Sequence, residues 1–523
     1  MHYKAKVLLL SIQSVDKPFK KTYTTYYYDL RRKPKMCDKN TGDSLRGLKP
    51  EGFFKWFEAI CRIPHVMRYE EKLSLFLQNF AQKRGLTCLR DEMGNILIRV
   101  PATGGYEKEP SVLLQGHMDM VGAKDDTATI DPITDPLVLC LEGNTLKAKG
   151  TTLGADDGVA VATMLAIADD PAIPHPELEL LCTVQEEVGL VGIRNFDMGQ
   201  IKSRRMINMD AGNSHRMCIS AAGGRIVTFE KQYACQSEEG TAMLQLQLLD
   251  GLGGHAGTKA HKNRACCINL MGELLFLLNQ EMPIALAEIT ADGPAIHGSC
   301  EAWIRIPAEK VACAEALLQT QFAEIKARYS KTDPDLAFAV CTRDGDKKTL
   351  SPKDSADIIR IMFLLHTGVR KSDAEDLNII VTSVTFGGIS LADGLFKGKY
   401  VVRSVEDSVG LLWHRRMTEL VRLFGFTAKL EHEYPAWPIG GSCVMQTRFS
   451  EEHKRLFGKE IYRQHDHASI EVNVIMRSIP DMDAVAIQPT SADIHTPDET
   501  LYIDEVQPFW DLLLAVLARK DSE

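Results

Sequence analysis

The chain has 523 residues, 45% of them hydrophobic and 25% charged, and this length suggests roughly two to four globular domains. The net charge of −9 and the isoelectric point near 6.0 argue against a nucleic-acid surface, because phosphate recognition normally needs a basic patch. A small cationic or zwitterionic substrate fits this charge better. No apolar run reaches the roughly 18 to 20 residues that span a bilayer, so we expect no membrane contact and a cytoplasmic location.

The thirteen cysteines include no Cys-x-x-Cys pair, which indicates reduced thiols rather than a disulfide framework. Any metal is therefore expected to have oxygen and nitrogen ligands.

The first 45 residues show no periodicity that continues, so we expect residues 1–45 to be a disordered extension, with Met36 as an alternative start. Apolar residues at helical spacing predict a helix over Phe53–Ile60 and a second over Tyr69–Arg84. The apolar run Val159–Ala168 predicts a helix that is buried on most sides.

Three apolar, strand-like runs each lead into residues that can bind a metal. Ser111–Gln115 precedes His117 and Asp119, Leu178–Gln185 precedes Glu186 and Glu187, and Met206–Met209 precedes Asp210. Two more candidates are Asp156, in the turn Gly154–Gly158, and the late His495. In open α/β sheets ligands gather outside the carboxyl ends of the strands, so we expect these side chains to converge in one crevice.

The candidate set matches the needs of a two-zinc site. Catalytic zinc takes histidine nitrogen and carboxylate oxygen and leaves a position open for water, and two metals need one carboxylate that bridges them. The candidates His117, Asp156, Glu187, Asp210 and His495 supply that number. Asp119 can hydrogen-bond the imidazole of His117. Glu186, the neighbour of the candidate ligand Glu187, can take a proton from water.

Each piece also has an ordinary structural interpretation. His-x-Asp is commonly a surface or capping pair, Asp-Asp-Gly is a turn or helix-cap signal, and Glu-Glu is usually a solvated strand end. Their joint occurrence after strands of one α/β domain is what favours function. For His297, His465 and His467, structural and functional roles remain equally open.

A different pattern begins near Asn213. Strand, helix, strand, strand, helix and strand are expected over 243–249, 264–279, 284–289, 301–306, 308–328 and 336–342. This β-α-β-β-α-β order predicts a ferredoxin-like domain. Because His495 lies beyond this insertion, the first domain is expected to be discontinuous.

The order His-x-Asp, Asp, Glu-Glu, Asp, His resembles the zinc exopeptidases that include carnosinases, acetylornithine deacetylase and glutamate carboxypeptidases. Within them it is most similar to the aminoacyl-histidine dipeptidases, also called Xaa-His dipeptidase or peptidase D. The resemblance extends from about Leu48 to the C-terminus. The matching segments are Phe57–His65, Arg90–Ile98, Gly116–Val121, Thr152–Gly158, Gly253–Gly257, Tyr434–Trp437 and Ile494–Glu499.

The resemblance implies an α/β, mixed-sheet zinc exopeptidase domain, formed by residues 46–212 and 405–523, with an inserted α+β ferredoxin-like lid at 213–404. It implies hinges near 212 and 405, and a homodimer joined through the lid. Two zinc ions per chain, replaceable by Co2+ or Mn2+, would share the bridging residue Asp156, with His117 and Asp210 completing one site and Glu187 and His495 the other. It also implies that Glu186 is the general base, Asp119 orients His117, and His255 and Arg403 bind substrate.

Two motifs depart from the family pattern. The lid motif Asn-Ala-Ile-Pro-Arg-Glu-Ala is replaced around Pro294–Cys300, so the asparagine expected to bind substrate is absent. The family's His-Ala-Gly-Leu-Glu becomes His467–Glu471, which keeps the histidine and glutamate but loses the glycine.

These features predict a cytoplasmic dizinc metallodipeptidase that cleaves unblocked dipeptides, with Xaa-His preferred. One alternative is an amidohydrolase acting on N-acyl amino acids. Another is a non-catalytic binding protein, which the altered lid motif favours and the intact Glu186 opposes.

Overall fold

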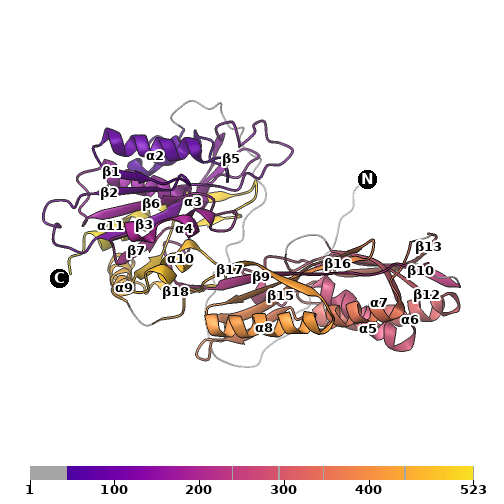
Figure 1. Ribbon diagram of the computed structural model, residues 1–523. Helices are drawn as coiled ribbons and strands as arrows, with labels where there is room; N and C mark the ends of the chain where they lie inside the picture. The colour runs from indigo at the N-terminus through magenta and orange to yellow at the C-terminus, as the bar shows by residue number, and fades with distance from the viewer. Residues whose placement is uncertain (1–43, 238–239, 292–294, 346, 441–442, 522–523) are drawn as a thin grey trace, which may run out of the picture. The chain divides into compact units, whose positions relative to one another are not determined.

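The computed structural model describes residues 44–237, 240–291, 295–345, 347–440 and 443–521 (Figure 1). Almost all of the expected N-terminal extension, including Met36, lies outside these residues, as does Pro294. Within the described ranges, no helix is both long and apolar enough to cross a membrane. Eleven described cysteines are free thiols, whereas Cys140 is disulfide-bonded, so the prediction of reduced thiols is wrong at that position.

The first sheet has eight strands in the order β1-β2-β6-β3-β7-β19-β8-β18 and is mixed, as predicted. Parallel pairing joins β3 to both β6 and β7, while β1, β2 and β6 pair in antiparallel fashion. The strands are β1 (Thr87–Arg90), β2 (Ile96–Val100), β3 (Val112–His117), β6 (Leu178–Thr183), β7 (Arg205–Asn208), β8 (Arg216–Ala221), β18 (Tyr462–Asp466) and β19 (Asp483–Ala486).

Helices cover both faces of this sheet, because alternate strand residues point to opposite sides. Leu114 belongs to a core shared with α1, α2, α3, α9 and α11, and its neighbour Leu113 to a core shared with α4 and α10. The helices are α1 (Glu51–Cys61), α2 (Glu71–Lys83), α3 (Ala155–Asp169), α4 (Val191–Asn195), η1 (Met198–Gln200), α9 (Val444–Phe457), α10 (Glu471–Ser478) and α11 (Ile503–Leu517).

Helix α1 buries Phe53, Phe54 and Phe57 on one stripe, and α3 is buried from Gly158 to Ile167, in line with their apolar sequences. Each fully buried phenylalanine contributes about 1.5 to 3 kcal/mol of hydrophobic stabilisation. A small separate sheet has the order β20-β21-β5-β4, formed by β4 (Leu139–Glu142), β5 (Thr145–Ala148), β20 (Ser491–Ala492) and β21 (Thr500–Tyr502).

The second sheet has nine strands, with β13-β10-β12-β11-β15-β16-β9-β17 in order and β14 paired with β15. All of its pairings are antiparallel. The strands are β9 (Gly223–Gln232), β10 (Thr241–Leu249), β11 (Ala285–Ala291), β12 (Cys300–Pro307), β13 (Ala337–Arg343), β14 (Gly368–Ser372), β15 (Ile380–Ala392), β16 (Leu395–Ser404) and β17 (Thr427–Tyr434).

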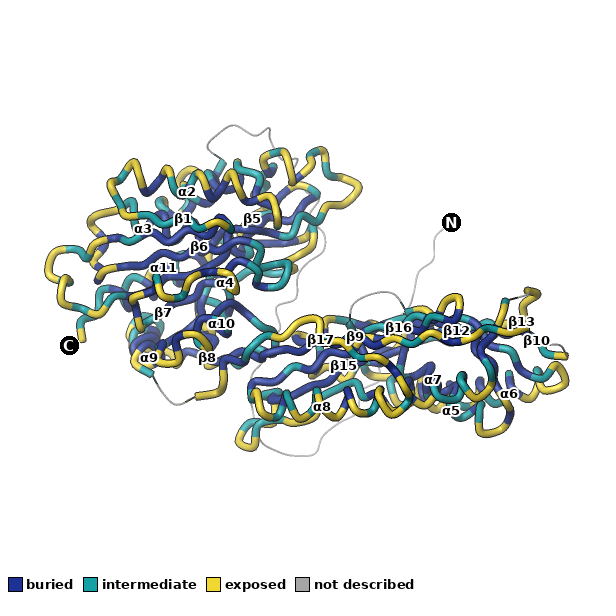
Figure 2. The backbone as a smooth tube through the Cα atoms, in the orientation of Figure 1, coloured by how far each residue is buried: buried dark blue, intermediate teal, exposed yellow. Residues whose placement is uncertain are grey.

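The ferredoxin-like order predicted from the sequence forms four of the nine strands of this sheet, as β10-α5-β11-β12-α6-β13. Helices cover one face, and their dark inner and yellow outer sides are visible in Figure 2. They are η2 (Ala260–Lys262), α5 (Cys267–Glu281), η3 (Ala308–Lys310), α6 (Val311–Tyr329), α7 (Pro352–Leu364) and α8 (Asp407–Leu423). The fold class expected from the sequence is confirmed.

The chain leaves the first sheet for the second, and later returns, at residues other than the expected boundaries near 212 and 405. Strand β8 still belongs to the first sheet, and β9 begins the second at Gly223. On the return, β17 pairs with β9 as far as Tyr434. The strands of the second sheet therefore lie between about residues 223 and 434, a range that we call the second unit. Its end was not expected, because β17 joins the sheet by a long-range pairing with β9 that local periodicity does not reveal.

Candidate metal centre

Three of the five candidate ligands come from the carboxyl ends of β3, β6 and β7. His117 is the last residue of β3, Glu187 follows β6 by four residues, and Asp210 follows β7 by two. Asp156 lies at the start of α3, and His495 lies between β20 and β21.

Asp156 lies between two imidazoles. Its Oδ1 is 3.1 Å from His117 Nε2, and its Oδ2 is 3.2 Å from His495 Nε2. Each imidazole also faces a second carboxylate, since Asp210 Oδ1 is 3.7 Å from His117 Nε2 and Glu187 Oε1 is 2.7 Å from His495 Nε2. The structure thus brings together all five side chains that the sequence suggested as ligands.

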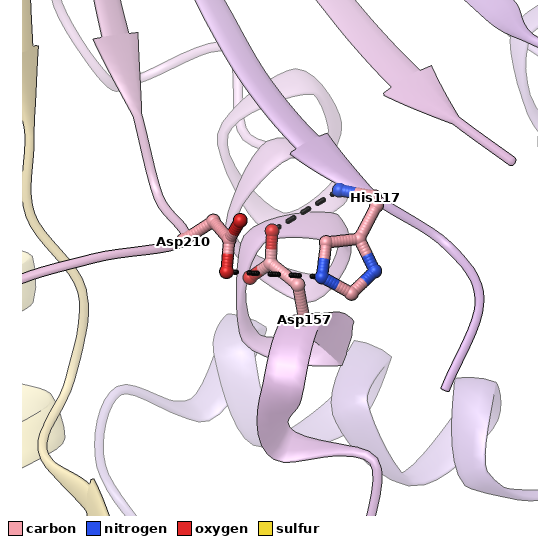
Figure 3. A group of neighbouring side chains, drawn as sticks. All are labelled: His117, Asp157 and Asp210. Carbon is pink, nitrogen blue, oxygen red and sulfur yellow. Dashed lines mark hydrogen bonds and ion pairs between the residues drawn. The ribbon is translucent and has the colours of Figure 1, made fainter. Parts of the chain in front are cut away.

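Asp157 is a further carboxylate at the site that the sequence interpretation did not assign. Figure 3 shows it beside His117 and Asp210, and the three can offer metal-binding atoms within 4.8 Å of one another. Its Oδ2 accepts the backbone N–H of His117 at 3.1 Å, and its Oδ1 accepts that of Ala160 at 3.3 Å. Because both oxygens are engaged by backbone groups, Asp157 mainly holds the end of β3 against α3.

Gly116 is needed for this contact. A Cβ at this position would lie 2.3 Å from both Ala160 Cβ and Asp157 Oδ2, closer than real Cβ atoms come. A side chain at residue 116 would therefore force β3 away from α3 or displace Asp157.

The crowding of carboxylates has strong electrostatic effects. Burial raises the pKa of Asp210 to about 7, and repulsion from Asp156 and Glu187 adds to this shift. Burial likewise raises the pKa of Glu186 well above its usual range. Hydrogen bonds that the His495 imidazole donates to Asp156 and Glu187 raise its pKa to about 10. Several buried carboxylates around two imidazole nitrogens are a donor set that divalent cations bind, so the residues present fit a metal centre.

Asp119 supports the site in a way that differs from the expectation. Its backbone carbonyl, rather than its carboxylate, accepts from His117 Nδ1 at 2.9 Å, whereas the nearest carboxylate oxygen is 3.6 Å away. The carboxylate instead accepts the backbone N–H groups of Glu186 and Glu187, at 2.9 and 3.1 Å. The turn that carries both glutamates is therefore fixed by Asp119.

Glu499 has a similar role that sequence reasoning missed. This buried carboxylate accepts the backbone N–H groups of Leu153, Gly154 and Asp156 at 2.8, 2.9 and 3.1 Å. It shapes the turn that presents the Asp156 side chain. Its only sequence signal was its place in the matched segment that also contains His495.

His255 and Arg403 lie next to each other in the second unit, with Arg403 Nη2 3.3 Å from His255 Nε2. Burial, assisted by the charge of Arg403, lowers the pKa of His255 to about 4, so its imidazole is neutral near pH 7. His467 Nε2 is 2.8 Å from Ser383 Oγ, and its pKa is lowered to about 3 by burial and by Arg403.

The other two undecided histidines differ from His467 in their surroundings. His465 Nδ1 is 2.7 Å from Ser220 Oγ. His297 is buried, and neither of its ring nitrogens has a partner among the described residues.

No protein-family model matches this chain. It is 30% identical over 478 residues to the cytosol non-specific dipeptidase of Escherichia coli strain K12, covering 90% of this chain and 98% of that protein. The chain belongs to the M20 dipeptidase family.

Solved structures agree with this M20 assignment. The aminoacylhistidine dipeptidase from Vibrio alginolyticus has a TM-score of 0.80 at 27% identity, over 91% of this chain and 98% of that one. A tripeptidase from Staphylococcus aureus, with a TM-score of 0.55 at 14% identity, covers 90% of this chain and 98% of that one and shares the fold. The family resemblance suggested by the sequence is confirmed, and the M20 protein is a metallopeptidase.

Proposed function

We propose that this M20 protein is a cytosolic dizinc dipeptidase that hydrolyses unblocked dipeptides, with Xaa-His preferred. The observation that supports this most directly is the position of Asp156, whose two oxygens face His117 and His495 at 3.1 and 3.2 Å. A carboxylate that reaches two sets of ligands at once is what a two-metal hydrolase requires.

The ligands divide into two groups around Asp156. His117 and Asp210 would hold one ion, and Glu187 and His495 the other. Zinc suits this mixture of imidazole and carboxylate ligands, and Co2+ or Mn2+ can substitute. When bound, two zinc ions would polarise the peptide carbonyl and lower the pKa of a water molecule towards about 7.

Glu186 is the proposed general base. Its pKa is raised by burial and by the carboxylates of Asp210 and Glu187, which suits a group that must take a proton and release it again. It would accept a proton from the attacking water and deliver it to the amine that leaves. The Asp119 carboxylate fixes the backbone of this glutamate, and so limits its freedom in the reaction.

His255 and Arg403 are the proposed substrate-binding residues. The guanidinium of Arg403 can form charge-assisted hydrogen bonds with the substrate's carboxylate. The neutral imidazole of His255 can donate to the scissile carbonyl. The two similar proteins are a non-specific dipeptidase and an aminoacylhistidine dipeptidase, and this similarity supports a dipeptide substrate.

We also propose a cytosolic homodimer joined through the second unit. The name of the E. coli relative supports the location. Light scattering after gel filtration should give twice the chain mass of 58.2 kDa at micromolar concentration. A measured mass equal to that of one chain would rule out the dimer.

The deciding experiment is a substrate panel with the zinc-loaded protein. Free dipeptides ending in histidine, including β-alanyl-histidine, are compared with other free dipeptides and with N-acetylated amino acids, while elemental analysis counts zinc. We expect about two zinc ions per chain and the highest kcat/KM for Xaa-His. Preference for N-acetylated substrates would favour the amidohydrolase, and zinc binding without any hydrolysis would favour the non-catalytic binding protein.

A further inference from the structure

Glu471 is a buried carboxylate that the proposed mechanism does not use. It is the first residue of α10, has 0% exposure, and is the glutamate retained in the altered motif His467–Glu471. A carboxylate that is fully removed from water carries a large cost unless it has partners, so its surroundings indicate what it is for.

Two hydrogen-bond partners of Glu471 lie at the carboxyl ends of strands that lead to the metal centre. Its Oε2 accepts from Gln115 Nε2 on β3, and from Thr183 Oγ1 at the end of β6 at 2.5 Å. Its Oε1 has no hydrogen-bond partner among the described residues. A single oxygen thus joins two neighbouring parallel strands beneath the site.

The contacts continue from Gln115 to a predicted ligand. Asn208 Nδ2, at the end of β7, donates to Gln115 Oε1 at 2.7 Å. Asn208 Oδ1 then accepts the backbone N–H of Asp210 at 3.1 Å. Gln115 is also two residues before His117 in β3, so the two side chains point to the same side of the sheet.

We infer that Glu471 is a positioning residue for the metal centre, acting through Gln115 and Asn208 on His117 and Asp210. Gln115 can donate to Glu471 and accept from Asn208 only in one orientation of its amide. The Glu471 carboxylate therefore fixes that orientation, and through it the orientation of the Asn208 amide that accepts from Asp210. This inference rests on the proposed function for the identity of the ligands.

Glu179 offers a matched control in the same sheet. It also has 0% exposure and lies on β6, four residues before Thr183, but it accepts from Arg99 Nε at 3.3 Å and from the backbone N–H groups of Lys202 and Ser203. It is a buried carboxylate with a structural role, and none of these hydrogen bonds involves a proposed ligand.

The experiment measures the zinc dissociation constant of the full chain by competition with a fluorescent chelator. Glu471→Ala should weaken zinc binding by about 10- to 100-fold, the usual effect of losing a group that orients a ligand. Glu471→Gln should stay within about threefold of the unmodified protein, because its amide oxygen can still accept from both partners. Glu179→Gln should lower the melting temperature and leave the zinc dissociation constant unchanged.

The outcomes separate the inference from the proposed function. If the unmodified protein binds no zinc, the proposed function fails. If it binds zinc and Glu471→Ala binds equally well, or if Glu471→Gln loses as much affinity as Glu471→Ala, the positioning inference is overturned.

A second variant covers the case in which Glu471→Ala does not fold. Gln115→Met removes the hydrogen bonds of Gln115 with Glu471 and with Asn208 and changes the side-chain volume little. It should weaken zinc binding by about 10- to 100-fold. Unchanged zinc affinity in a folded Gln115→Met variant would overturn the inference as well.

Discussion

The substitution Asp119→Asn tests how the turn with two glutamates is held. Each carboxylate oxygen of Asp119 accepts one backbone N–H, from Glu186 at 2.9 Å and from Glu187 at 3.1 Å. An asparagine keeps one acceptor and turns an NH2 group towards the other N–H. A hydrogen bond to a charged group contributes about 1.5 to 3 kcal/mol. If that energy is what holds Glu186 in place, kcat should fall by about 10- to 150-fold, at 1.36 kcal/mol for each factor of ten.

Zinc binding should change much less in this variant. His117 donates to the backbone carbonyl of Asp119, and the substitution leaves that atom in place. The assay is therefore kcat for a free dipeptide, measured beside zinc content per chain. A protein that loses zinc while keeping its kcat per bound zinc would refute this reasoning, and would mean that the carboxylate acts on His117 as the sequence alone suggested.

Four other predictions can be tested with the same protein. Glu187→Gln should lower zinc content and activity together, whereas Glu186→Gln should keep zinc while kcat falls by about 10² to 10⁴; equal zinc loss in both would mean that both are ligands. Arg403→Ala should raise KM by about 10- to 100-fold, from a lost charge-assisted hydrogen bond, and an unchanged KM would show that another group binds the carboxylate. Gly116→Ala should destabilise the protein by about 1 to 3 kcal/mol through overpacking, seen as a lower melting temperature, and normal melting would contradict the close contacts. For His467, the folded pKa of about 3 lies below the unfolded value of about 6.5, so the unfolded chain binds more protons and stability falls as the pH drops from about 7 towards 3. Urea unfolding of His467→Gln should therefore vary less between pH 7 and pH 5, and an unchanged pH dependence would argue against a buried neutral imidazole.

Local sequence patterns predicted the helices and the strand ends well. The second helix was expected over Tyr69–Arg84 and spans Glu71–Lys83, because its apolar stripe and the glycine that follows are both local signals. The candidate ligands were also visible, since each follows an apolar run or a turn. These features depend on residues close together in the chain.

The supporting residues could not be found in this way. Glu499 contacts the backbone of Leu153, 346 residues earlier, and Glu471 contacts Gln115, 356 residues earlier. Neither spacing has any periodicity that a sequence pattern could reveal. The same reason explains the displaced boundaries of the second unit, where β17 is assigned by its pairing with β9.

The strand order of the first sheet has a consequence for how the chain is made. Strand β19 pairs with β7 on one side and β8 on the other, although β7 and β8 are close in sequence and β19 begins at Asp483. At a synthesis rate of roughly 5 to 20 residues per second, about 14 to 55 seconds pass between the synthesis of β7 and the synthesis of its partner strand β19. An open strand edge is a template for wrong pairing, so this interval is when the protein should depend most on chaperones. His495 emerges later still, so a nascent chain cannot assemble all five proposed ligands until the second unit has already been synthesised.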